Sequence, residues 1–200
     1  MSNIKQEKSA AAFRAKTHNN EQAMTAFCKV QFSAFQAKKQ LIIILISLAM
    51  IVVGVSDIVG LAASAFLVPV GCFALMYLSY IPKSDAEKLI KAYNGKFPTS
   101  IYSFTDKGFD IISGKDRNHL GYESIIRLIE DDNYLFFFAS PQVAYLVDKS
   151  SIQPNSLKHF KDYTQKRVGV EWTVTRPWYS INMSVLMKGR KNTKSVKKKK

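Results

Sequence analysis

Three histidines are the residues best suited to bind a metal ion, but they occur singly. His18, His119 and His159 form no helical i, i+4 pair and have no cysteine partner in sequence. Zinc sites are usually marked by such pairs, because the ligands must converge on one ion. We therefore expect no metal site and no cofactor.

Acidic side chains gather once, at Glu130, Asp131 and Asp132. General acid–base catalysis needs carboxylates held in environments that differ in pKa, whereas acidic residues beside a turn are typical of a solvated loop. The sequence also lacks a nucleophile elbow, a phosphate-binding loop and a dinucleotide fingerprint. It thus predicts a protein that is not an enzyme.

Basic residues mark two places where an anion could bind. Lys115 and Arg117 stand in one expected hairpin loop, and Lys149 follows an expected strand. Each could contact an anionic phospholipid headgroup. The alternative is that these side chains belong to solvated loops without a ligand.

The C-terminal segment is strongly basic in a chain whose formal net charge is +14. No acidic residue follows Glu171. Lysine and arginine close to an anionic leaflet each contribute about 1 kcal/mol of attraction. We therefore expect lipid contact by Lys188, Arg190, Lys191, Lys197, Lys198, Lys199 and Lys200. A solubilising tail without a partner and contact with RNA are the alternatives, and we favour lipid over nucleic acid.

An almost uncharged stretch runs from Leu41 to Ile81, with Asp57 as its only Asp, Glu, Lys, Arg or His residue. At ~1.5 Å per residue a single helix of this length would measure about 60 Å, which is twice the hydrocarbon core of a bilayer. The chain should therefore turn back near Gly54–Asp57 and form a hairpin of two transmembrane helices over 38–55 and 58–81.

Small residues in the second span indicate a close helix contact. Gly60, Ser64 and Gly71 would let the backbones approach, because lipid supplies no hydrophobic drive for association. The contact is expected within the hairpin. In the alternative, these residues build a larger homo-oligomer or pore, with Asp57 around its mouth rather than in a simple turn.

Lysines flank the two spans, and the connecting turn has none. Lys38 and Lys39 precede the uncharged stretch of the first span, and Lys83 and Lys88 lie after the second span. By the positive-inside rule, both termini should be cytoplasmic in a multi-pass protein of the cell membrane.

The N-terminal arm, residues 1–37, should contain a short strand near Ala11–Lys16 and a helix that begins near Asn20. Met24, Phe27 and Phe35 recur on one face of that helix. This face could lie in the headgroup layer or pack on the soluble domain of the same chain. The sequence does not separate these alternatives.

After Pro82 the composition becomes that of a globular domain. Ser84 to Asn94 is expected to form a separate short helix capped by Ser84. Short alternating runs then predict an antiparallel meander followed by a helix that Gly169 ends and one more strand near Val170–Val174. The expected meander strands are Ser100–Thr105, Phe109–Ser113, Leu120–Glu130, Asn133–Ala139 and Val143–Val147.

The order of these elements resembles the YcxB-like proteins, small bacterial membrane proteins with two adjacent transmembrane helices. The matching segments are 102–109, 121–125, 128–131, 134–137 and 145–149. The resemblance implies a C-terminal domain of pleckstrin-homology-like (PH-like) character. We therefore expect a membrane α-helical hairpin plus an α+β domain with a PH-like antiparallel meander or barrel capped by a C-terminal helix.

These observations predict four regions: the arm over 1–37, the hairpin over 38–81, the PH-like domain over 82–176 and the basic tail over 177–200. The expected role is a non-catalytic adaptor or regulator that binds a protein or anionic lipid headgroups at the cytoplasmic face. A small homo-oligomeric transport or pore-forming protein is the alternative. The lipid bilayer, a protein partner and a second copy of the chain are the expected partners.

Overall fold

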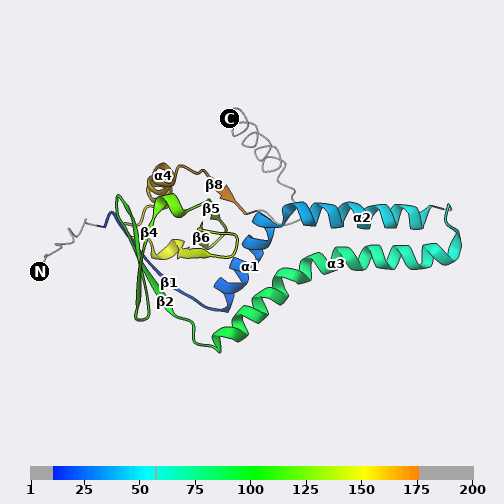
Figure 1. Cartoon of the computed structure of the whole chain (residues 1–200), viewed down its shortest axis with the longest axis horizontal. Helices are drawn as coiled ribbons and strands as arrows, with labels where there is room; N and C mark the ends of the chain where they lie inside the picture. Colours follow the sequence, from blue (N-terminus) through cyan, green and yellow to red (C-terminus); the bar gives the residue numbers. More distant parts are fainter. Residues whose placement is uncertain (1–10, 57, 176–200) are drawn as a thin grey trace, which may run out of the picture.

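The computed structural model describes residues 11–56 and 58–175. A helical hairpin projects from a domain in which helix α1 lies between a β-sheet and the hairpin (Figure 1). The helices are α1 (Glu21–Phe35), α2 (Ala37–Val55), α3 (Gly60–Tyr93) and α4 (Leu157–Val168). The strands are β1 (Phe13–His18), β2 (Thr99–Phe104), β3 (Gly108–Ser113), β4 (Asp116–Gly121), β5 (Arg127–Glu130), β6 (Tyr134–Phe138), β7 (Ala144–Asp148) and β8 (Trp172–Val174).

The N-terminal strand belongs to the same sheet as the first strands after the hairpin. The first sheet has the order β1-β2-β3-β4, and β1 pairs antiparallel with β2 so that Phe13 lies opposite Phe104. Phe13 and Ala15 point into the core, whereas Arg14 and Lys16 point outward. The arm therefore completes the domain that follows the hairpin.

The second sheet has the order β7-β6-β5-β8, with β8 parallel to β5. Thr17 joins the two sheets, because its buried hydroxyl donates to the carbonyl of Leu146 at 2.8 Å and accepts from the amide of Asp148 at 3.0 Å. Arg14 of β1 and Gln153, a few residues after β7, form a further antiparallel β-bridge. The two sheets thus meet along β1 and the segment that contains β7.

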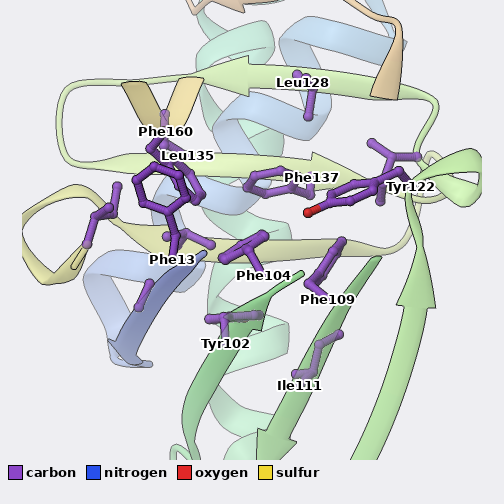
Figure 2. Packing of buried hydrophobic residues seen from close by; sticks show 14 residues of the cluster. Phe13, Tyr102, Phe104, Phe109, Ile111, Tyr122, Leu128, Leu135, Phe137 and Phe160 are labelled. Atoms are coloured by element: carbon purple, nitrogen blue, oxygen red, sulfur yellow. The ribbon is translucent and has the colours of Figure 1, made fainter. Parts of the chain in front are cut away.

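An aromatic core fills the space between the two sheets and α4 (Figure 2). Phe104, Phe137 and Phe160 are fully buried, and their ring centroids lie 4.8–6.2 Å apart. Rings at these distances pack edge to face or tilted, which adds to the free energy gained from burial. The expected helix over α4 is confirmed, and Gly169 ends it at a φ of 72°.

Strand β6 is buried on both faces, since all five of its residues are buried. Leu135 and Phe137 face the aromatic core, whereas Phe136 and Phe138 face a second cluster with Met24 of α1. The apolar face of α1 thus packs on the second sheet. Of the two alternatives predicted for this face, it is the one in which the helix packs on the soluble domain of the same chain. Asn20 caps it by accepting a hydrogen bond from the amide of Ala23 at 2.8 Å.

Two features of the expected meander are wrong. Leu120–Glu130 is not one strand, because a 3₁₀ turn at Tyr122–Ser124 separates β4 from β5. The hairpin loop expected around Lys115 and Arg117 is shorter than predicted, because strand β4 begins at Asp116 and pairs with β3. Because this break divides the strands between two sheets, the described residues form no closed barrel.

The hairpin helices follow the expected spans over most of their length. Helix α2 ends at Val55, so Gly54 lies within the helix and not in the turn. Asp57 lies outside the described residues. Helix α3 continues without interruption to Tyr93, so the separate helix expected after Ser84 is wrong. Pro82 is tolerated inside α3 and is buried together with Ala86 on the face toward the domain.

Candidate functional site

The described histidines each pair with a different neighbour. His18 contacts Thr99, His119 contacts Asp110, and His159 contacts Ser156. Among the described residues, no three His, Cys, Asp or Glu side chains come together to hold a metal ion. That the chain binds no cofactor stays a prediction.

The acidic run is divided between two structural roles. Asp131 supports the β5–β6 turn, because its carboxylate accepts from the amides of Asn133 and Tyr134 at 2.8 and 2.9 Å. Glu130 instead points to two lysines that sequence reasoning did not connect with it. The ammonium of Lys149 lies 2.7 Å from Glu130 Oε1, and Lys161 of α4 bonds to Glu130 Oε2.

The Glu130–Lys149–Lys161 cluster is partly buried and ties three elements together. The exposed fraction of the Glu130 side chain is 14%, and that of Lys149 is 18%. Burial by itself raises the pKa of Glu130, but the hydrogen bonds and charges of the two lysines outweigh it and hold this pKa below its ordinary value. The backbone carbonyl of Glu130 also accepts from Thr175 at 2.7 Å. The cluster therefore anchors η2 (Lys149–Ser151), α4 and the end of β8 to strand β5.

Replacing Glu130 with glutamine should lower the free energy of unfolding by about 1–3 kcal/mol near neutral pH, because two lysines lose their counter-charge. A carboxyl whose pKa is lowered on folding stabilises above its unfolded pKa and loses that contribution as pH falls through the folded pKa. The deficit of Glu130→Gln should therefore shrink below about pH 4. Denaturant unfolding of the full chain in detergent, once near neutral pH and once below about pH 4, measures this deficit.

Asp85→Asn is the matched control for this measurement. Asp85 pairs with Lys88 at 3.3 Å, but both side chains are at least half exposed. Such a surface pair contributes little, so its loss should change stability only slightly at either pH. An equal deficit of Glu130→Gln at both pH values would contradict the role assigned to the cluster.

The basic residues expected to contact lipid do not form one site. Lys115 lies in the exposed turn between β3 and β4, and Arg117 is exposed on β4. Lys149 lies after β7 of the other sheet and is held by Glu130. The remaining basic residues, Lys188, Arg190, Lys191, Lys197, Lys198, Lys199 and Lys200, lie outside the described residues. Lipid contact by these side chains stays a prediction.

The domain around the Glu130–Lys149–Lys161 cluster shows a similarity to known proteins. Residues 104–163 match the family model described as YcxB-like protein. This segment is YcxB-like. The family expected from the sequence is therefore confirmed over these residues, and all three members of the cluster lie within them. No curated protein and no solved structure matches the chain.

Two helices precede the YcxB-like segment, and both are long and apolar enough to cross a membrane. Only 17% of the apolar window of α2 and 11% of that of α3 is buried inside the protein, whereas the core helix of a soluble domain would be mostly covered. Many apolar side chains of the hairpin, which projects from the domain (Figure 1), are therefore exposed. Together with the YcxB-like match, this indicates a membrane protein.

The small residues of the hairpin differ in what they contact. A Cβ added at Gly71 would lie 2.9 Å from the carbonyl oxygen of Ser47, so Gly71 sits where the two helices touch. A Cβ at Gly60 would meet nothing within 4 Å, and the Ser64 hydroxyl donates to the Gly60 carbonyl of its own helix. Gly54, which sequence reasoning placed in the turn, is instead a contact residue, because a Cβ there would lie 2.8 Å from the side chain of Val68.

Proposed function

We propose that this chain is a non-catalytic integral membrane protein that holds a YcxB-like domain at the cytoplasmic face of the cell membrane, where it acts as an adaptor or regulator. The observation that carries the proposal is the continuity between hairpin and domain. Helix α3 passes from the apolar span to the domain without a break, and α1 packs on the second sheet before α2 begins. A protein partner and anionic lipid headgroups are the proposed ligands.

The electrostatic pattern supports this orientation. Lys38 and Lys39 are exposed in the first turn of α2, and Lys83 and Lys88 are exposed on α3 beyond the apolar span. Positive charge is retained on the cytoplasmic side of a membrane, so the domain end of the hairpin should be the inner end. The PH-like character of the domain is part of the same proposal and comes from the YcxB-like resemblance.

Accessibility of single cysteines in intact cells tests the orientation. Ile58 is 85% exposed between α2 and α3. Asn118 is exposed on β4, which lies in the domain at the end of the molecule away from the tip of the hairpin (Figure 1). With Cys72 replaced by alanine, a membrane-impermeant maleimide should label Ile58→Cys in intact cells and Asn118→Cys only after permeabilisation. Cys28 can remain, because burial and the charge of Asp85 raise its pKa to about 11 and the thiol stays protonated.

Labelling of Asn118→Cys in intact cells would contradict the cytoplasmic placement. The background variant without an introduced cysteine serves as the blank. The transport or pore-forming alternative stays a prediction. The close contacts of Gly71 and Gly54 lie between the two helices of one hairpin and do not require a second copy of the chain.

A further inference from the structure

Two exposed apolar side chains lie at one end of the second sheet. Ile126 is 46% exposed directly before β5, and Val143 is 47% exposed directly before β7. Arg127 and Ala144 both pair with Phe138, the last residue of β6. Ile126 and the turn Ser140–Val143 therefore lie at the same end of the sheet, and we call them the sheet rim.

The sheet rim is tied to the last turns of α1. The guanidinium of Arg127 donates to the carbonyl of Ala34 at 2.6 Å and lies 4.7 Å from the ring centroid of Phe35. The side-chain amide of Gln31 donates to the carbonyl of Pro141 at 2.8 Å. These contacts hold the rim beside the C-terminal end of α1.

The C-terminal end of α1 is also the point at which the chain enters the apolar span. Helix α2 begins at Ala37, and Gln40 fixes the joint by donating from its buried amide to the carbonyl of Phe32 at 2.8 Å. From Ala34 to Leu41 a helix would rise only about 10 Å. The headgroup layer on each side of a bilayer is roughly 5–8 Å thick. The rim is therefore close to the level of the headgroups.

Charged and aromatic side chains mark the same level on both helices. The contact between Ser47 and Gly71 sets the antiparallel register, and about nine residues farther toward the domain lie Lys38 on α2 and Tyr80 on α3. Tyr80 is 53% exposed, and Lys38, Lys39 and Lys83 are also exposed. Exposed tyrosines are enriched at membrane interfaces, and lysines there attract anionic headgroups.

We propose that the sheet rim rests on an anionic bilayer surface, with the side chains of Ile126 and Val143 in the headgroup layer. The bilayer is the surface that must lie close to the rim, because the rim is bound to α1 and α1 is followed directly by the membrane helix α2. The inference depends on the proposed function only in that α2 and α3 must span the bilayer. It names a lipid-contacting surface separate from Lys115, Arg117, Lys149 and the basic tail.

Depth-dependent quenching in vesicles tests the proposal. The full chain with Cys72→Ala carries an environment-sensitive fluorophore at Val143→Cys. It is reconstituted into phosphatidylcholine vesicles with or without phosphatidylglycerol, and spin-labelled headgroup lipid is present in both leaflets. The matched control is Ile101→Cys, since Ile101 is 42% exposed on β2 of the first sheet, which lies away from the hairpin (Figure 1). Ile126→Cys repeats the measurement at a second rim position.

Headgroup quenching should be at least about twofold stronger at Val143 and Ile126 than at Ile101, and phosphatidylglycerol should increase it. Equal quenching at rim and control positions would overturn the proposal. A shielded fluorophore at Val143 that no lipid quenches would also overturn it, because a protein surface would then cover the rim. Quenching that does not respond to phosphatidylglycerol would overturn the anionic preference.

A probe inside the span separates this proposal from the proposed function. Val52 is 66% exposed on α2, and Val52→Cys should be quenched by lipid spin-labelled in its acyl chain. If Val52 is quenched and Val143 is not, the rim placement alone fails. If Val52 is not quenched, the transmembrane hairpin fails, and the proposed function fails with it.

Discussion

Replacing Phe137 with alanine is expected to lower the free energy of unfolding by about 3–5 kcal/mol, the usual cost of removing a buried aromatic ring. Phe137 is fully buried on β6, and its ring lies 5.6 Å from both Phe104 and Phe109 and 5.4 Å from Trp172. These neighbours come from β2, β3 and β8, so the cavity left behind would open between both sheets. Rigid aromatic neighbours cannot close such a cavity by a change of rotamer alone.

Thermal or denaturant unfolding of the full chain in detergent measures this loss. Trp172 contacts Phe137, so its fluorescence reports on the core directly once Trp178 is replaced by phenylalanine. Ile101→Ala is the matched control, because Ile101 is 42% exposed and its truncation should cost much less. A loss below about 1 kcal/mol for Phe137→Ala would contradict the packing between the sheets.

Replacing Gly71 with leucine is expected to force α2 and α3 apart. An added Cβ would lie 2.8 Å from Cγ1 of Ile51 and 2.9 Å from the carbonyl oxygen of Ser47. The Ile51 side chain can rotate, but the carbonyl is part of a helix backbone and cannot give way. Overpacking of this kind typically costs about 1–3 kcal/mol, and more where backbone must shift.

Cys72→Leu is the control for the hairpin, because Cys72 is the next residue of α3 and is exposed. A leucine there faces outward and should leave the hairpin contact unchanged. Unfolding by increasing SDS in mixed micelles measures both variants. If Gly71→Leu is as stable as Cys72→Leu, the helices do not touch at Gly71.

Local patterns were sufficient to predict most of the individual elements. The apolar run predicted both spans, and alternation predicted four of the five expected meander strands near their final positions. Strand β4 was missed because Asp116, Arg117 and His119 are polar and exposed along an edge, so no alternation marks it. The continuation of α3 was missed because a proline usually ends a helix in water. Here Pro82 is buried, and the packed face of α3 continues beyond it to Ala86.

Long-range pairing could not be predicted from the sequence. A strand near Ala11–Lys16 was expected, but nothing local shows that β1 pairs with β2, which follows the whole hairpin. The candidate site was limited in the same way. The sequence marks Glu130 only as part of an acidic run, because its partners Lys149 and Lys161 lie 19 and 31 residues farther along the chain. Only the fold brings β5, η2 and α4 together around one carboxylate.

The unbroken course of α3 makes the second apolar span and its extension toward the domain one continuous helix about 50 Å long, given 34 residues at ~1.5 Å each. Pro69 and Pro82 weaken this helix at two points, since each removes one backbone hydrogen bond, and α3 curves along its length (Figure 1). The domain is held at two places, by this helix and by α1. A change in the tilt of the hairpin helices should therefore also rotate the two sheets relative to the membrane.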